Sequence, residues 1–494
     1  MQLPSRFSAP RLPPVAVACL AVALAGCPSG PAPPPPPVAV AARTRLAVAC
    51  ADAVYAARLG QQAKAWAGRT GVVVTVVADP AAADILVIPP GRLGATLATP
   101  GLACVPLPAA FKAPDHPLLR GRIAEAYRDA LVNWAGEVVG LPLLADGAAL
   151  VYRTDRFAAE ADRAGFARQF GRPLLPPRTY EDALDVAAYF RAADGRPSLS
   201  PLPAAPGELG TLFLRVAACY DRPAATEAAV VRDAPPAPAS ALDLLADPFT
   251  GEPRFRRPGF VAAARWLAAT AAHRPKPGAA PDAGGAVLEF LELRDFGKLP
   301  LDPATGGVAA RYAVAPLPGT RNSFDAGGKP VAAAGGGNYV PLLGTHTLVG
   351  VVRQSCADPQ AAWDFLAEAA AAPGSAAALS DPAAGGGPFR REHVDEANER
   401  VWLGYRFDAE QSHQLALAMR GFLALNVANP ATVSRLPDAD ARQAALETIL
   451  RRLGTGELTP EAAMAEAAAA WKALDAKVPP ADLARLRRNA VGLP

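Results

Sequence analysis

Short apolar runs and helical patterns alternate along the first part of the chain. Residues 46–50 (LAVAC) and 84–88 (DILVI) predict strands, and residues 72–77 (VVVTVV) are β-branched enough to predict a buried parallel strand. Between residues 50 and 72, apolar residues recur at helical spacing: Tyr55, Leu59, Ala63 and Trp66. The pattern stops at Gly68 and Gly71. This alternation predicts a doubly wound α/β lobe.

The pattern changes at residues 138–152 (VVGLPLLADGAALVY), where a turn signal, a proline, an acid beside a glycine and an apolar strand follow one another. We expect this segment to cross between two lobes. Residues 312–319 and 348–352 predict two further strands.

Later helices begin at recognisable caps. Thr179 is placed as an N-cap, and Pro258 and the pair Asp358-Pro359 open two more helices. The apolar stripe after Pro258 is Phe260, Ala263, Ala264 and Leu267, and the stripe after Asp358-Pro359 is Trp363, Leu366 and Ala370. Residues 444–453 and 459–474 predict two C-terminal helices.

The first residues have the pattern of an export signal. Arg6 and Arg11 precede an uncharged apolar run at 15–24. The four residues at its end, Leu24-Ala25-Gly26-Cys27, resemble a bacterial lipobox. We expect residues 1–26 to be a lipoprotein signal peptide and Cys27 to be the lipid anchor. The alternative is an ordinary signal peptide with a chance cysteine. Residues 27–43 contain a run of five prolines and predict an extended tether.

Charge and size narrow the classes of partner. The formal net charge is +3 with acids and bases interleaved, which disfavours nucleic acid or an anionic lipid surface as the main partner. The chain has 494 residues, enough for two or three domains after the leader, and its later alanine-rich stretches are too interrupted to span a membrane.

The remaining cysteines are far apart and form no CxxC pair, so a zinc knuckle is unsupported: Cys50, Cys104, Cys219 and Cys356. Disulfides and buried thiols both remain open at these positions.

The sequence carries few signs of catalysis. It has no HExxH motif, no GxSxG elbow and no Walker lysine, and its five histidines are isolated. Glu289 and Glu292 occur at helical spacing, where acid pairs are usually a solvated face. We expect no enzyme activity, no metal and no cofactor. A glycosidase remains the enzymatic alternative, because retaining glycosidases also show only scattered carboxylates.

The order of the segments resembles extracellular solute-binding proteins of carbohydrate ABC importers, family 1 of that group. The segments that carry the resemblance are TRLAVACAD, RTGVVVTVV, ADILVIPPGRLGATLATPGLACVPL, GEVVGLPLLADGAALVYRTDRF, LLPPRTYEDALDVAAYF, VAPLPG, ADPQAAWDFLAEAAAAPGSAAAL and LRRLGTGELTPEAAMAEAAAAW. The chain departs from the family at Tyr152-Arg153, where Tyr-Asn is common, and at GGAVLEFLELRDFGKL, which lacks the usual Trp-Pro turn.

The resemblance implies an α/β, two-lobe periplasmic-binding-protein-like fold of class II, with doubly wound sheets joined by a hinge and followed by C-terminal helices. The implied lobe 1 comprises residues 44–148 and 316–380, and lobe 2 comprises residues 149–315 and 381–480. Ligand is then expected between the lobes, since open α/β sheets bind at the carboxyl ends of their strands.

Carried onto this sequence, the resemblance implies a set of ligand-binding residues: Asp52, Arg92, Asp146, Glu292, Arg294, Gly336, Gly337 and Asn338. Carboxylates and guanidinium groups suit vicinal hydroxyls, and the glycines let backbone approach a ligand. Each residue also has a structural alternative: Asp52 as an N-cap, Asp146 as a turn residue, Arg92 as a surface charge and the glycines as a plain loop.

The function implied by the resemblance is capture of a small solute, a sugar or a polyol, by a monomer tethered at the periplasmic face of the cell envelope. The closed form would deliver the solute to the permease subunits of an ABC importer. The alternatives are a ligand sensor for a signalling receptor and an envelope glycosidase.

Overall fold

The computed structural model describes residues 44–494 except 223–242, 277–284, 326, 334–336 and 424–430. The predicted signal peptide, the predicted lipid anchor Cys27 and the predicted tether therefore lie outside the described residues. The compact unit begins at Thr44. Among the described residues, no helix is long and apolar enough to cross a membrane.

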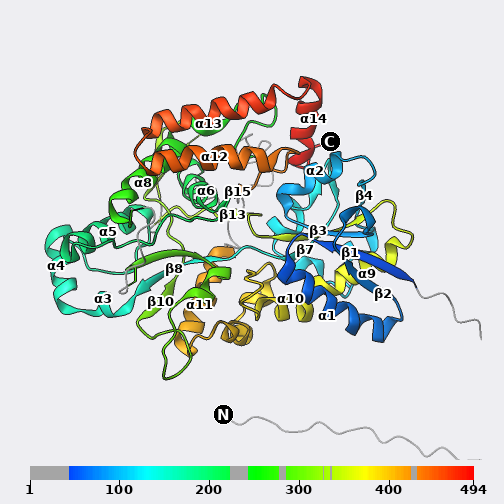
Figure 1. The fold of residues 1–494 in the computed structure, drawn as a ribbon, viewed down its shortest axis with the longest axis horizontal. Coiled ribbons are helices and arrows are strands. Elements are labelled where there is room, and N and C mark those ends of the chain that lie inside the picture. The colour runs from blue at the N-terminus through cyan, green and yellow to red at the C-terminus, as the bar shows by residue number, and fades with distance from the viewer. Residues whose placement is uncertain (1–43, 223–242, 277–284, 326, 334–336, 424–430) are drawn as a thin grey trace, which may run out of the picture. The chain divides into compact units, whose positions relative to one another are not determined.

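The first strand, helix and strand form as the sequence predicts (Figure 1). β1 (Arg45–Cys50) leads through Asp52 into α1 (Ala53–Thr70), whose buried residues are the four that recur at helical spacing. The helix ends at Gly71 with φ 78°, a left-handed conformation that glycine adopts without a Cβ penalty. β2 (Val73–Val77) and β3 (Ile85–Ile88) then pair parallel to β1 on either side of it.

These strands belong to a six-stranded sheet of order β2-β1-β3-β14-β4, with β7 also paired to β14. The other members are β4 (Cys104–Val105), β7 (Leu141–Leu144) and β14 (Leu348–Arg353). β14 runs antiparallel to β3, so the sheet is mixed. β2 is its edge strand and buries only Val74, so the prediction of a buried strand there is wrong. β-Branched residues also suit an edge that is covered on one face.

The chain leaves this sheet at residues 145–147 and enters a three-stranded sheet, which confirms the predicted crossing. That sheet has the order β10-β8-β9, with β8 (Ala148–Arg153) between β10 (Tyr312–Ala315) and β9 (Leu288–Glu292). Glu289 and Glu292 therefore lie on a strand, and their prediction as a solvated helix face is wrong. The chain returns to the large sheet through residues 344–347, between β13 (Leu342–Leu343) and β14.

A helical layer surrounds α6 (Glu208–Asp221), in which every residue after Glu208 is buried. It packs against α8 (Pro258–Thr270) and α12 (Ala439–Gly454), and α12 packs against α13 (Pro460–Asp475). Figure 1 shows α12 and α13 side by side in orange and red. The predicted stripes on α8 and on α9 (Pro359–Ala370) are all buried. Apolar burial along these faces is the main stabilising contribution of the layer.

The other elements cover the sheets and join them. They are η1 (Pro80–Ala82), η2 (Pro90–Arg92), α2 (Leu93–Ala98), η3 (Ala109–Lys112), η4 (Arg120–Arg122), η5 (Ala126–Ala130), β5 (Asn133–Trp134), β6 (Glu137–Val138), α3 (Thr154–Ala158), α4 (Glu160–Phe170), α5 (Tyr180–Asp194), η7 (Arg254–Arg256), η8 (Ala271–His273), η9 (Leu293–Lys298), β11 (Asn322–Phe324), β12 (Pro330–Ala332), α10 (Ala372–Leu379), η11 (Arg391–Val394), η12 (Glu396–Tyr405), α11 (Ala409–Leu423), β15 (Ala431–Thr432) and α14 (Pro480–Ala490).

All four cysteines of the described residues are free thiols: Cys50, Cys104, Cys219 and Cys356. Burial raises the pKa of Cys50 and Cys104 to about 11 and that of Cys219 to about 12. A thiol in such surroundings stays protonated and acts as a small apolar side chain.

Candidate functional site

The two crossing segments are joined by one carboxylate. Asp146 lies in the first crossing and accepts hydrogen bonds from the second, through Gly344 N at 2.6 Å, His346 N at 2.5 Å and the hydroxyls of Thr345 at 2.8 Å and Thr347 at 2.7 Å. The Tyr127 hydroxyl donates a fifth bond at 3.2 Å. Both carboxylate oxygens are therefore occupied by protein donors.

Asp146 is fully buried, with an exposed fraction of 0%. Burial alone would raise the pKa of this carboxyl, but the backbone N–H groups of His346 and Gly344 and the Thr347 hydroxyl outweigh burial and hold the pKa below its ordinary value. The group is thus a charged connection inside the hinge region.

Glycines allow the backbones to meet around Asp146. Gly344 has φ 97°, and a Cβ there would lie 2.8 Å from Val433 Cγ2. Gly387 donates from its N–H to Ala145 O at 2.7 Å, and a Cβ on Gly387 would lie 1.7 Å from Asp146 O. The glycine run 385–387 thus packs directly on the first crossing.

A buried ion pair lies beside this connection. Arg215, near the middle of α6, forms a two-pronged pair with Glu292 at the end of β9, and its second prong, from Nη2 to Oε2, measures 3.1 Å. The side chains are 8% and 13% exposed. Burial would lower the pKa of Arg215, but the nearby Glu292 carboxylate raises it above its ordinary value. Arg215 Nη2 also lies 3.4 Å from the Thr345 hydroxyl, in the second crossing.

His346 completes a set of polar groups that we call the crossing cluster: Asp146, Arg215, Glu292, Thr345 and His346. The His346 Nε2 lies 3.7 Å from Glu292 Oε2. Burial is the main reason why the pKa of His346 falls below its ordinary value, so the ring is neutral at pH 7. The cluster thus combines a neutral imidazole and a hydroxyl with paired charges.

The more exposed side of the cluster is a second ion pair. Arg294 Nη2 lies 2.6 Å from Glu208 Oε1 at the start of α6, and their side chains are 40% and 18% exposed. Leu293 N donates to Gly147 O at 3.0 Å, which connects this segment to the first crossing. Guanidinium, carboxylate, hydroxyl and imidazole groups can all form hydrogen bonds with a hydroxylated solute.

The structure therefore brings together three of the predicted site residues, Asp146, Glu292 and Arg294. Two others lie elsewhere. Asp52 is exposed and is the N-cap of α1, where its Oδ1 accepts from Tyr55 N at 2.7 Å. Arg92 is 55% exposed and pairs with Asp440 of α12 at 3.4 Å. Both positions match the structural alternatives stated above.

Asn338 contacts the end of α6, whereas Gly337 lies beside the backbone that precedes α5. Asn338 is buried, and its amide donates to the carbonyls of Cys219 and Arg222 at the carboxyl end of α6, the second at 2.7 Å. A Cβ on Gly337 would lie 3.1 Å from Arg178 O. Gly336 lies outside the described residues. A role of these residues in ligand binding stays a prediction.

Three members of the crossing cluster were missed from the sequence: Arg215, Thr345 and His346. One signal could have found Arg215. It is the only charged residue within LFLRVAACY, and a lone arginine in an otherwise apolar helix implies a buried partner. No sequence spacing places Thr345 and His346 beside Asp146, because their contact depends on two segments 198 to 200 positions apart.

A contact between Ser375 and His393 must be tested as a possible catalytic pair. Ser375 Oγ lies 2.8 Å from His393 Nε2, and both residues are 1% exposed. His393 Nδ1 accepts from the backbone N–H groups of Phe389 at 3.3 Å and Arg390 at 3.4 Å. Nδ1 is then unprotonated and Nε2 carries the proton, which is the wrong tautomer for a base that activates serine. Among the described residues, no group of three or more candidate ligands could hold a metal ion.

This buried ring predicts a pH dependence of stability. Burial, together with a smaller contribution from the nearby Arg390, lowers the pKa of His393 to about 3. The unfolded chain binds a proton near pH 6.5, so below that pH the folded state should lose stability until about pH 3, by at most about 1.4 kcal/mol per pH unit. Above pH 7.5 the contribution should be constant.

The matched variant is His393→Asn, whose Oδ1 can accept the same N–H bonds but cannot titrate. Urea unfolding at pH 4.5 to 8 should show the wild-type chain losing stability relative to H393N as the pH falls. A difference between the two that does not change with pH would contradict the buried neutral ring.

The fold is similar to solved two-lobe binding proteins. The cyclic alpha-maltosyl-1,6-maltose binding protein from Arthrobacter globiformis superposes with a TM-score of 0.59 at 14% identity, over 88% of this chain and 99% of that one. The sugar-binding protein MalE from Xanthomonas citri gives 0.59 at 15% identity, over 88% and 98%. An ABC transporter solute binding protein from Agrobacterium radiobacter K84, in complex with ribitol, gives 0.55 at 16% identity, over 87% and 98%.

At this level of identity the comparisons establish the fold: the chain has the two-lobe periplasmic-binding-protein-like fold expected from the sequence, and the similar structures are binding proteins rather than enzymes. No protein-family model matches the sequence, and no curated protein does. Fold alone does not determine function, which must be argued from the site.

Proposed function

We propose that the chain is an extracytoplasmic solute-binding protein that captures a small sugar or polyol between two lobes and delivers it to an ABC importer. The observation that carries the proposal is the crossing cluster, a set of polar groups at the point where the chain passes between the sheets. In a two-lobe fold, this is the region where the lobes meet, and ligands bind at such junctions.

The fold supports the same function. The similar structures include proteins described as binding a cyclic maltose oligomer, a sugar and ribitol, and they match along most of this chain. Arg215 is paired with Glu292, and Arg294 beside the cluster is paired with Glu208. The charge of Asp146 is met by five protein hydrogen-bond donors. A site with internally paired charges suits a neutral hydroxylated solute better than an ion.

The proposed mechanism is a population shift between open and closed lobes. β11 and β13 contact α6, and β11 also contacts α8. We therefore assign residues 316–343 to lobe 2 and begin the second part of lobe 1 at the crossing 344–347. The remaining lobe bounds follow the sequence prediction. Lobe 1 then comprises residues 44–148 and 344–380, and lobe 2 comprises residues 149–343 and 381–480.

The proposal includes attachment to the envelope through lipid on Cys27, followed by the tether of residues 27–43. These residues carry the lipobox-like pattern LAGC and the run of prolines. A lipid tether would keep the capture domain near its permease subunits.

The test is a thermal-shift screen of sugars and polyols, with ribitol and maltose included. At a concentration 100 times its Kd, a bound solute should stabilise the folded chain by about 2.7 kcal/mol, which for the roughly 410 described residues raises the Tm by about 3 °C. Arg294→Gln should weaken that shift, whereas Arg265→Gln, an exposed arginine paired with Glu461 on α8 and α13, should not.

The bound solute should also be recovered intact after incubation. If no member of the screen raises the Tm, solute capture is wrong for this class of ligand. If an oligosaccharide is cleaved, the glycosidase alternative replaces it.

A further inference from the structure

A pocket with long polar side chains on one wall lies away from the crossing cluster, between α1 and the junction of α9 with α10. Its volume is about 490 Å³, which falls in the range of small-molecule sites. Nine residues line it: Arg58, Gln61, Gln62, Arg69, Glu368, Ala371, Pro373, Gly374 and Ala377. No residue of the crossing cluster is among them.

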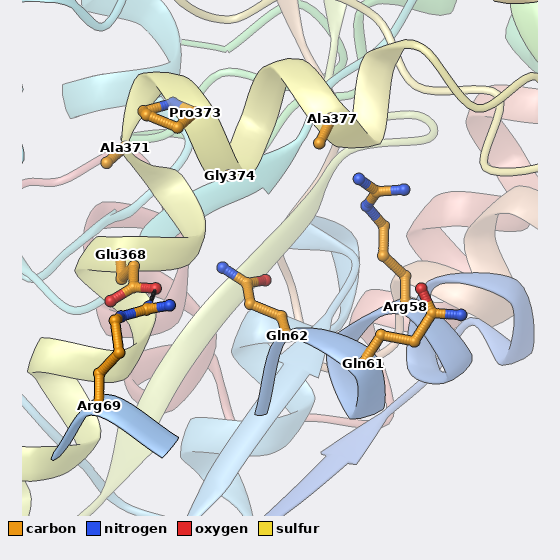
Figure 2. A pocket seen from close by; sticks show the side chains of 9 residues that line it. All are labelled: Arg58, Gln61, Gln62, Arg69, Glu368, Ala371, Pro373, Gly374 and Ala377. Carbon is orange, nitrogen blue, oxygen red and sulfur yellow. Dashed lines mark hydrogen bonds and ion pairs between the residues drawn. The ribbon is translucent and has the colours of Figure 1, made fainter. Parts of the chain in front are cut away.

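One wall of the pocket consists of long polar side chains from α1. Figure 2 shows Arg58 and Gln62 extending from α1 toward the helix that carries Gly374 and Ala377. The carboxylate nearest to Arg58 is Asp381, and the distance from Nη1 to Oδ2 is 3.8 Å, too long for a hydrogen bond. The Arg58 side chain is only 22% exposed. Its guanidinium therefore has donors available inside a partly dehydrated site.

The lining residues together carry one net positive charge, that of Arg58. Arg69 forms an ion pair with Glu368, so these two charges cancel. Gln61 and Gln62 make no side-chain hydrogen bond with any part of the chain that the structure describes. Arg58 is thus the one lining residue whose charge is not matched within hydrogen-bond distance by the described residues.

The opposite wall is small and brings backbone close. Ala371 is the N-cap of α10 and contributes no side-chain cap, and Pro373 and Gly374 are in the first turn of that helix. A Cβ on Gly374 would lie 2.6 Å from Glu368 O and 3.2 Å from Gln62 Nε2, so a larger residue would narrow the pocket. The end of α9 and the start of α10 meet at Ala371, so their opposite partial charges offset each other and the positive charge of the pocket comes from Arg58.

We propose that this pocket is a second ligand site, which takes a small anion that carries a carboxylate or phosphate group. A planar guanidinium binds these groups through two parallel hydrogen bonds, and the neighbouring amides of Gln61 and Gln62 can bind further polar atoms of the ligand. A neutral sugar would leave Arg58 with only its 3.8 Å ion pair to Asp381. The inference goes beyond the proposed function and does not rest on it.

The pocket is connected with the crossing cluster through one short segment. Asp381, the distant partner of Arg58, accepts from Ala383 N at 3.0 Å and so holds the turn that leads into Gly385–Gly387. A Cβ on Gly385 would lie 2.2 Å from Arg294 Cβ. An anion bound to Arg58 would compete with Asp381 for the guanidinium. Because Asp381 holds the turn before Gly385–Gly387, this competition would act on the segment that lies beside the cluster.

The test is isothermal titration calorimetry of the purified full chain with inorganic phosphate and with succinate, each against sodium chloride at equal ionic strength. We expect saturable binding of at least one of the two probes. Arg58→Gln should weaken it at least about tenfold, and Arg58→Lys should weaken it less. The control is Arg265→Gln, which should bind the probe as the wild type does.

A second variant adds a carboxylate instead of removing the arginine. Ala377 is exposed on the pocket wall, so Ala377→Glu should fold normally and occupy Arg58 with its own carboxylate, which blocks the probe. The proposal is overturned if neither probe binds saturably, or if R58Q and A377E bind it as the wild type does. Sugar and polyol binding by R58Q, measured in the same preparation, separates this result from the fate of the proposed function.

Discussion

Replacing Asp146 by Ala should lower the free energy of unfolding by about 3 to 5 kcal/mol. The substitution removes the one acceptor for five protein donors, four of which belong to the second crossing. The backbone N–H groups of Gly344 and His346 would then be buried without a partner. A buried N–H group without an acceptor lowers the free energy of unfolding by much more than a hydrogen bond at the surface raises it.

Urea unfolding of the purified chain measures this loss, and Asp482→Ala is the control. Asp482 lies on α14, is 53% exposed and pairs with Arg485, so its removal should cost less than about 1 kcal/mol. Asp146→Asn keeps the shape but places an NH₂ group among donors, and it should fall between wild type and D146A. Equal stabilities of D146A and D482A would show that the connection between the crossings contributes nothing.

The same carboxylate predicts the effect of acid. Because its pKa is lowered in the folded state, its contribution is complete above the pKa of the unfolded chain, about 4, and is lost as the pH falls further. The stability difference between the wild type and D146A should therefore be constant from pH 5 to 8 and shrink below pH 4.

Periodic patterns explain how much of the fold could be predicted. The buried faces of α1, α8 and α9 follow from helical spacing, and the caps at Thr179 and Asp358 accept from Asp182 N and Ala361 N as expected. These features are local, since each depends on residues within one helix. The order of such segments along the chain was enough to indicate the two-lobe fold.

What could not be predicted depends on pairing between distant segments. VVVTVV has the composition of a central strand, and its place at the edge of the sheet depends on which strands lie beside β1. Glu289 and Glu292 fit helical spacing equally well, and β9 exists because it pairs with β8. Every residue of α6 after Glu208 is buried, including the polar Thr211, Arg215 and Asp221, because the helices that surround it come from distant parts of the chain.

The same reasoning applies to the candidate site. Asp146, Glu292 and Arg294 were expected from the resemblance and do meet at the crossings. Their partners were not expected, because Arg215 comes from α6 and His346 from the return crossing. Whether any of them contacts a solute stays a prediction that the screen decides.

Breaking the buried ion pair of the cluster should have the second large effect. Arg215→Met leaves the Glu292 carboxylate with only the neutral His346 ring nearby, whose Nε2 lies 3.7 Å away, and Glu292→Leu leaves a buried guanidinium. Each single variant should lose about 3 kcal/mol, because one charge stays buried without its partner. The exposed pair of Arg265 and Glu461, at 66% and 56%, is the control, and its removal should leave the free energy of unfolding almost unchanged.

The double variant Arg215→Met with Glu292→Leu distinguishes an ion pair from ordinary packing. If the pair is the cause, the two losses should not add, and the double variant should be more stable than their sum by about 2 kcal/mol or more. Additive losses would mean that each side chain acts only through its other contacts, among them the cation–π contact of Arg215 with Phe422, 5.7 Å from its ring centre. Because Arg215 is on α6 and reaches Thr345 in the second crossing, a non-additive result would also connect the helical layer with the hinge that the proposed capture mechanism requires to move.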